Sequence, residues 1–117
     1  MPEHEEQVAF FDYVDIMMNS NPDYENIFAI PNAGKRSIGA GSYYRAEGLR
    51  AGVPDVFVAV PNAKFPGLFM EFKYKKGKTT EQQEQWLNRL SRVGYACVIV
   101  RSSDAAIRVV DKYLRDK

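Results

Sequence analysis

The hydrophobic positions of the N-terminal segment repeat at helical spacing. Within residues 3–18, Phe10 and Val14 follow one another at a step of four. Gln7 and Glu3 continue the same face toward the N-terminus, at steps of three and four. Such spacing places these side chains on one side of a helix. The segment is therefore predicted to be an amphipathic helix that packs with one side against the rest of the chain.

Downstream of this helix, apolar runs of strand length alternate with segments of helical character. The predicted strands are 27–31, 55–60, 68–74 and 95–100. The predicted helices are 42–52, 79–94 and 103–116. The last strand is a continuous apolar run, which is typical of a buried strand. The order of the elements predicts an α/β fold of the α-β-α-β-β-α-β-α type, with a mixed central sheet flanked by helices.

Composition limits the class of protein. With 117 residues and 45% apolar side chains, the chain has the size and composition of a single globular domain. No apolar run is long enough to span a bilayer, and the acidic N-terminus is unlike a signal peptide. A single cysteine excludes a disulfide framework. These features predict a soluble protein of the cell interior.

Basic residues are clustered, although the net charge is only +1. The first cluster lies within 35–50, in and after a glycine-rich segment at 32–41 that is predicted to be a loop. The second lies within 73–78, directly after a predicted strand. Two local clusters of this kind favour a phosphate-binding surface, and an ordinary solvated face is the alternative.

Three charges interrupt the two strands of the predicted hairpin, namely Asp55, Glu71 and Lys73. Burying charge in a sheet is unfavourable unless the charge has a partner. Side chains alternate across a strand, so Glu71 and Lys73 share a face. If Val60 pairs with Leu68, Asp55 lies opposite Lys73 and diagonal to Glu71, about 5–8 Å away. A slip of one residue would move Asp55 to the other face, and the sequence leaves the register open.

Two carboxylates this close repel each other unless a cation lies between them. Carboxylate oxygens suit a hard divalent ion such as Mg²⁺ or Mn²⁺. The ammonium of Lys73 would then orient an attacking water or stabilise charge on a phosphate oxygen. The alternative is a cross-strand salt bridge between Asp55 and Lys73, with Glu71 at a solvated edge.

The Pro54–Asp55 pair and the Glu71-Phe72-Lys73 triplet resemble the PD-(D/E)XK nuclease signature. The surrounding segments are similar, in order and spacing, to the VRR-NUC family: "EHEEQVAFFDYV", "IPNAGKR", "AEGLRAGVPDVFVAV", "GLFMEFKYKKGKTTEQQEQWLNRL" and "GYACVIVRS". The resemblance covers nearly the whole chain and implies one nuclease domain over 1–117 with a restriction-endonuclease-like fold. It implies metal-dependent cleavage of DNA, as in the stand-alone Holliday-junction resolvases of bacteriophages or prophages. Such proteins are expected to act as homodimers in the cytoplasm of the bacterial host.

The same resemblance implies roles for individual residues. The metal-binding groups would be Asp55, Glu71, the main-chain carbonyl of Phe72, and a first-helix acid. Glu3 best matches that acid because it shares a face with Gln7, and Glu6 is the reserve. Lys73 falls on the catalytic lysine, and Gln83 on a glutamine of the following helix. The alternative role of Gln83 is to complete a capping box with Thr80, and that of Glu3 is to favour a helix N-terminus.

The basic segments and their neighbours would hold the DNA backbone. The residues assigned to this role are Asn32, Lys35, Arg36, Arg45, Lys75, Lys76 and Lys78. Contacts of this kind carry little sequence information, so recognition by DNA shape is expected. Two other functions remain open: a flap or nicking nuclease, and a module that binds nucleic acid without cutting it.

Overall fold

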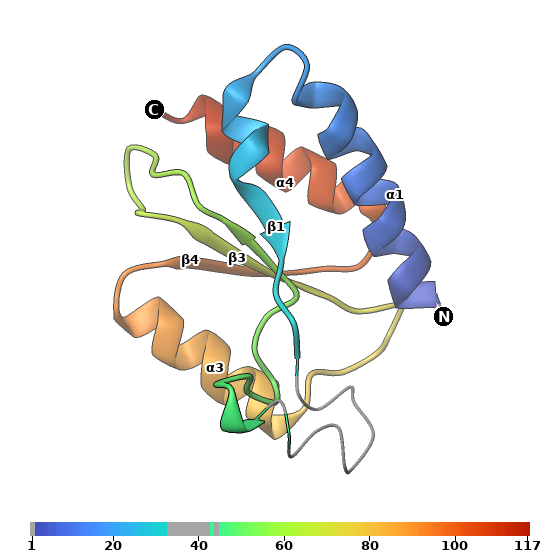
Figure 1. Cartoon of the computed structure of the whole chain (residues 1–117), viewed down its shortest axis with the longest axis vertical. Coiled ribbons are helices and arrows are strands. Elements are labelled where there is room, and N and C mark those ends of the chain that lie inside the picture. The colour runs from blue at the N-terminus through green and yellow to red at the C-terminus, as the bar shows by residue number, and fades with distance from the viewer. Residues whose placement is uncertain (1, 33–42, 44) are drawn as a thin grey trace.

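The computed structural model describes residues 2–32, 43 and 45–117. Its elements follow one another as α1 (Pro2–Met17), η1 (Pro22–Asn26), β1 (Ile27–Ala29), β2 (Val56–Val58), β3 (Leu68–Phe72), α3 (Glu81–Arg92), β4 (Ala96–Val100) and α4 (Ser103–Arg115) (Figure 1). The α/β architecture predicted from the sequence is confirmed. The short helix predicted at 42–52 is shorter than expected, because only 43, 45 and 46 are described as helical and 47–52 form turns and extended chain.

The four strands form one mixed sheet in the order β1-β2-β3-β4. Strands β1 and β2, and likewise β2 and β3, pair antiparallel, whereas β3 and β4 pair parallel. Strand β4 therefore lies at an edge, and its Ile99 side chain is 38% exposed. The expectation that this apolar segment is a buried strand holds only in part, because Val100 is buried, Ile99 is exposed and the other three residues of β4 are half-buried.

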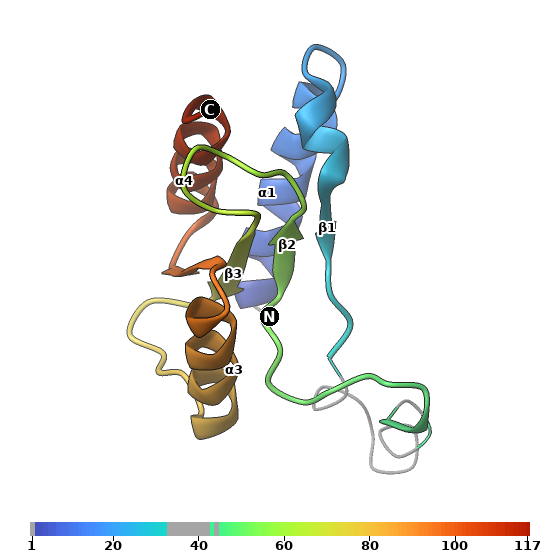
Figure 2. The ribbon, with the colours of Figure 1, turned by 90° about the vertical axis from the view of Figure 1, so that its left-hand side faces the viewer.

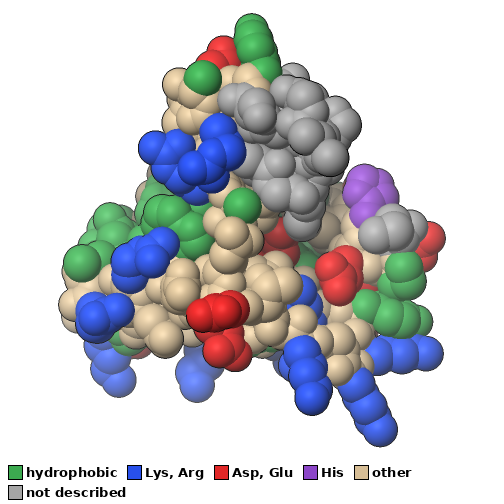
Figure 3. Space-filling view, turned by 90° about the horizontal axis from the view of Figure 1, so that it is seen from below, with side chains coloured by type: hydrophobic (Ala, Val, Ile, Leu, Met, Phe, Trp, Pro, Cys, Tyr) green, Lys and Arg blue, Asp and Glu red, His purple; other side chains and the backbone are tan. Residues whose placement is uncertain are grey.

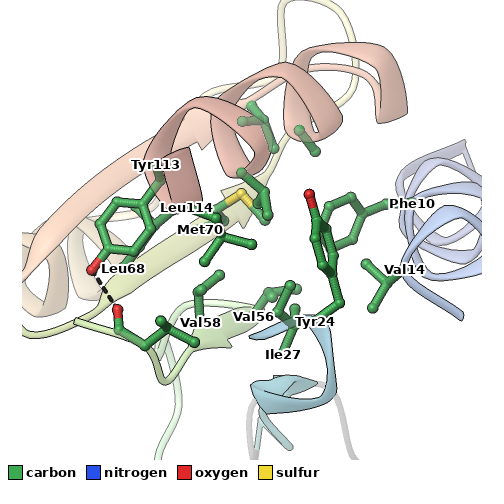
Figure 4. Close-up of a cluster of buried hydrophobic side chains, with 14 of the residues drawn as sticks. Phe10, Val14, Tyr24, Ile27, Val56, Val58, Leu68, Met70, Tyr113 and Leu114 are labelled. Carbon is green, nitrogen blue, oxygen red and sulfur yellow. Dashed lines mark hydrogen bonds between the residues drawn. The ribbon is translucent and has the colours of Figure 1, made fainter. Parts of the chain in front are cut away.

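The register of β2 and β3 differs from the arrangement considered from the sequence. Leu68 pairs with Val58 and not with Val60, so the strands are offset by two residues. The carbonyl of Val60 instead accepts a hydrogen bond from the Tyr113 hydroxyl of α4 at 2.7 Å (Figure 4). An offset of two leaves every side chain on its expected face, because the strand alternation has a period of two.

Helices α1 and α4 pack together and cover one face of the sheet (Figures 1 and 2). A buried hydrophobic core lies between these two helices and the sheet (Figure 4). It includes Phe10 and Val14 of α1, Met70 of β3, and Val110 of α4. The amphipathic first helix is thus confirmed, since Phe10 and Val14 are its buried residues.

Helix α3 lies against the opposite face, where it packs against β4 (Figure 1). This face carries a partly buried aromatic cluster, in which Phe57 stacks on Phe69 at 4.3 Å between ring centroids and Tyr95 meets both rings edge-on. The only buried side chain of α3 is Gln83, at 8% exposure. Among the described residues, no helix has the length and apolar character needed to cross a membrane.

Candidate active site

Asp55 lies directly before β2 and is turned toward β3. Its N–H donates to the Met70 carbonyl at 3.0 Å, and its Oδ2 accepts from the Phe72 N–H at 2.7 Å. The side chain is only 5% exposed, and the preceding Pro54 is fully buried. A charge-assisted hydrogen bond to a main-chain donor holds a carboxylate in a defined direction. Asp55 is therefore a fixed, buried acid beside the end of β3.

Glu71 is buried more completely, at 1% exposure, and points toward α3. Its Oε2 accepts a hydrogen bond from Gln83 Nε2 at 3.1 Å. Gln83 is itself 8% exposed, and its Oε1 accepts from the Thr80 N–H at 2.8 Å. Gln83 therefore completes the capping box of α3 and also donates to a buried carboxylate, while its part in catalysis stays a prediction.

The two acids lie on the same face of the sheet. Asp55 precedes Phe57 by two residues and Glu71 follows Phe69 by two, and the stacked Phe57 and Phe69 rings mark that face. The burial of Glu71 excludes the alternative in which this acid occupies a solvated edge. Likewise, no ion pair joins Lys73 to an acid within the part of the chain that the structure describes.

Lys73 and Glu3 lie near the end of β3. Lys73 is half-buried, and its N–H donates to the Val100 carbonyl at 2.9 Å. Glu3 Oε2 accepts from the N–H of the next residue, Tyr74, at 3.3 Å. Glu6 instead accepts from the Ser103 N–H at 2.7 Å, at the N-terminus of α4. The structure thus brings Glu3 against the strand that carries the site, and uses Glu6 to cap a helix.

The donor set fits a hard divalent cation in part. Asp55 and Glu71 supply oxygen ligands, the kind that Mg²⁺ prefers. Among the described residues, however, no three His, Cys, Asp or Glu side chains form a group that could hold a metal ion. The two carboxylates would therefore form the protein's contribution together with main-chain oxygen and water, which Mg²⁺ commonly retains. Ligation by Glu3 and by the Phe72 carbonyl stays a prediction.

Asn32 is buried at 8% exposure and bonds to the chain that leads into Asp55. Its Nδ2 donates to the Val53 carbonyl at 3.3 Å, and its Oδ1 accepts from the Gly52 N–H at 3.4 Å. This clamp fixes the segment just before Pro54, so Asn32 acts here as a positioning residue. The contact with DNA predicted for it stays a prediction.

The predicted DNA-binding cations fall into three groups. Arg45 is exposed, as are Lys75, Lys76 and Lys78, which lie in the turn after β3. Lys35 and Arg36 lie outside the described residues. Sequence reasoning missed Arg101, whose Nη1 donates to the carbonyls of Lys75 and Gly77 at 2.7 Å each and so holds the basic turn. No local pattern indicates a contact made across more than twenty residues of chain.

Comparisons with known proteins indicate the family and the fold. Residues 14–104 match the model of the VRR-NUC domain. A solved structure described as a VRR_NUC domain protein superposes with a TM-score of 0.80, at 21% sequence identity, and covers 99% of this chain and 90% of its own. At that identity the likeness shows the fold. A search of curated protein sequences finds no significant match.

Proposed function

The chain belongs to the VRR-NUC domain family, a nuclease-type family, and on this premise we propose that it is a metal-dependent endonuclease that hydrolyses DNA phosphodiester bonds. The observation that carries the proposal is the pair of buried acids, Asp55 and Glu71, on the face of the sheet opposite the apolar core. Carboxylate oxygens are the ligands that a hard divalent cation such as Mg²⁺ prefers.

In the proposed site, Asp55 and Glu71 hold Mg²⁺, for which Mn²⁺ can substitute, and the Phe72 carbonyl and Glu3 are further candidate ligands. A divalent ion held there would supply a nucleophilic water at neutral pH and would offset charge on the phosphate. The Phe72 N–H keeps Asp55 in place, and Gln83 orients Glu71 through its amide. Such supporting hydrogen bonds are what make a ligand set rigid. Lys73 orients the attacking water or stabilises charge on a phosphate oxygen.

The finer assignment is a Holliday-junction resolvase. A four-way junction offers two symmetric strands to cut, which a two-fold homodimer would match with two sites. Exposed Arg45, Lys75, Lys76 and Lys78 would hold the backbone around the scissile bond. A phage or prophage origin, and the host cytoplasm as the location, are part of the same proposal.

The test is to incubate the purified protein with a four-way junction, a flap and a blunt duplex of equal length, in Mg²⁺ or in EDTA. We expect cleavage only with Mg²⁺, with paired symmetric nicks in the junction. Preferential cutting of the flap would identify a flap nuclease. Binding of all three substrates without cleavage, in Mg²⁺ and in Mn²⁺, would favour the non-catalytic module.

A matched pair of variants excludes a contaminating nuclease. Lys73→Met removes the ammonium beside the acid pair but keeps the length of the side chain, and we expect cleavage to be lost while DNA binding is largely kept. Lys112→Met makes the same change at an exposed position on α4, on the other side of the sheet, and should cleave normally. Full activity of Lys73→Met would remove Lys73 from the mechanism.

A further inference from the structure

An open pocket of about 290 Å³ lies between α3 and the turn that leads to Asp55. Three arginines line it together with the indole of Trp86, and the remaining lining is uncharged: Arg45, Arg50, Arg89, Trp86, Gln82, Gln85 and Ala51. No acid is among these residues. Viewed from below α3, Lys and Arg side chains project around the margin of the molecule (Figure 3). The pocket therefore suits an anionic ligand.

The indole forms a fixed part of this pocket. Trp86 Nε1 donates to the Ala51 carbonyl at 3.1 Å, which ties α3 to the turn at 51–52. The Arg89 guanidinium lies over the indole ring, with its carbon 4.4 Å from the centroid. A planar guanidinium on an aromatic ring is a cation–π contact that also leaves N–H groups free to donate at the edge. Trp86 and Arg89 thus combine a stacking surface with phosphate donors.

The segments that line the pocket also contact residues that position the acid pair. Gly52 has φ of +84°, and a Cβ at this position would lie 2.7 Å from the Cβ of Gln82, so only glycine permits this close approach to α3. The Gly52 N–H is also bonded to Asn32, which positions the chain before Asp55. On α3 itself, Gln83 and Trp86 are three residues apart, and such residues are neighbours with about 5–6 Å between Cβ atoms.

Size and chemistry together indicate the ligand. The volume is near the lower end of the roughly 300–1,000 Å³ typical of small-molecule sites, so the pocket has about the size needed for one nucleotide. Arginine binds phosphate with a fork of donors, and aromatic rings stack on unpaired bases. Gln82 and Gln85 add amide groups that donate and accept hydrogen bonds.

We propose that this pocket binds a single unpaired nucleotide of the DNA substrate, next to the cleavage site. Arg45 and Arg50 hold its phosphate, while Arg89 and Trp86 hold its base. The inference rests on the proposed function insofar as it takes DNA as the substrate. It gives a physical reason for selectivity toward branched DNA, since flaps and opened branch points expose unpaired nucleotides, whereas a continuous duplex does not.

Trp86 provides a direct measurement, because it is the only tryptophan of the chain. Its fluorescence would be recorded while a short oligothymidylate or a blunt duplex is added in EDTA, which prevents cleavage. We expect saturable quenching by the oligothymidylate and much weaker quenching by the duplex. Binding of a labelled oligothymidylate, detected by anisotropy without any change in Trp86 emission, would overturn the assignment.

Two variants of α3 distinguish binding in the pocket from general electrostatic attraction to the basic surface. Arg89→Ala should weaken oligothymidylate binding roughly ten-fold, the equivalent of one lost stacking and charge-assisted contact. Arg92 is three residues further along α3, is exposed and does not line the pocket. Arg92→Ala removes the same charge there and should change the affinity little. Equal losses in both variants would indicate diffuse electrostatic attraction and refute the pocket.

These outcomes are distinguishable from failure of the nuclease proposal. Mg²⁺-dependent cleavage without quenching of Trp86 would refute the nucleotide pocket alone. Quenching that depends on Arg89, in a protein that cuts no substrate, would refute the nuclease and leave the pocket as a nucleic-acid site.

Discussion

The two faces of the sheet differ in what they bury. Under α1 and α4, the buried side chains are apolar, and Val58, Met70 and Val110 have no exposed surface. On the α3 face, the buried groups include the carboxylates of Asp55 and Glu71 and the Gln83 amide, while hydrophobic Phe28 and Ile99 remain 49% and 38% exposed.

Because of this difference, neighbouring residues of a single strand contribute either to the stability of the fold or to the proposed site. In β3, Met70 and Phe72 belong to the core, and Glu71 between them faces α3. The apolar face supplies most of the burial that stabilises the fold. The polar face can then keep an acid pair whose desolvation is unfavourable, because the rigid sheet beneath holds it. Substitutions on the two faces should therefore have different effects.

The largest effect is expected for Asp55→Asn. Asparagine is nearly isosteric and can still accept from the Phe72 N–H through its amide oxygen, so the fold should be kept. Loss of a ligand charge removes several kcal/mol of transition-state stabilisation, which corresponds to about a thousand-fold lower cleavage rate. Single-turnover cleavage of the preferred substrate measures the rate, and circular dichroism checks the fold.

Asp15→Asn is the matched control, since Asp15 is exposed on α1. It should cleave at the rate of the unmodified protein. Wild-type activity in Asp55→Asn would show that the α3 face holds its acids for a reason other than catalysis.

The second comparison concerns stability and uses neighbouring residues of β4. Val100 is 2% exposed in the core, and Ile99 beside it is 38% exposed on the α3 face. Val100→Ala should lower the free energy of unfolding by about 2–3 kcal/mol, through lost burial and a cavity. Ile99→Ala removes more carbon atoms but should lower it by less than about 1 kcal/mol. Urea denaturation measures both, and the reverse order would contradict the assignment of the core to one face.

How far the sequence predicts this arrangement depends on how far apart along the chain the contacting residues lie. The helix spacing of Phe10 and Val14 and the alternation at Glu71 are local, and they predict which side each residue faces. The β2–β3 register is not local. Contacts with the C-terminal helix hold the loop between these strands: the Tyr113 hydroxyl donates to the Val60 carbonyl, and Asn62 Nδ2 donates to the Tyr113 carbonyl.

The residues of the site likewise divide into those that local patterns indicate and those that depend on contacts between distant segments. Family resemblance and strand alternation indicate Asp55 and Glu71 as a pair, and the capping-box spacing indicates Gln83. The choice between Glu3 and Glu6 depends on how α1 lies relative to β3 and α4, which no pattern within α1 specifies. The clamp formed by Asn32 and the pocket around Trp86 likewise join segments that are 20 to 35 residues apart.

A third pair of variants tests the double role of Gln83 on the α3 face. Gln83→Glu keeps an acceptor for the Thr80 N–H but places a carboxylate where an amide donates to Glu71. Cleavage should fall roughly ten- to a hundred-fold, the usual effect of losing a supporting hydrogen bond to a metal ligand. Thr80→Ala removes the other half of the capping box and should lower stability by about 1 kcal/mol with cleavage kept. Equal cleavage rates in the two variants would indicate that Gln83 serves only to cap α3.

The smallest effect concerns the apolar face, where α1, η1 and α4 meet around Asp111. The Tyr13 and Tyr24 hydroxyls both donate to its carboxylate. Burial raises the pKa of Tyr24, and the Asp111 charge and hydrogen bond raise it further. Above pH 10 the unfolded chain then loses a tyrosine proton that the folded protein retains, so stability falls as pH rises.

This decline should begin near the ordinary tyrosine pKa, about 10, and be absent at neutral pH. Tyr24→Phe removes the titrating group, so its free energy of unfolding should fall less steeply between neutral and alkaline pH. Urea denaturation across that range measures both slopes. Tyr43→Phe, at an exposed position, is the control and should keep the original slope. An unchanged slope in Tyr24→Phe would mean that the alkaline sensitivity originates outside the buried hydroxyl pair, and that the apolar face is electrostatically inert.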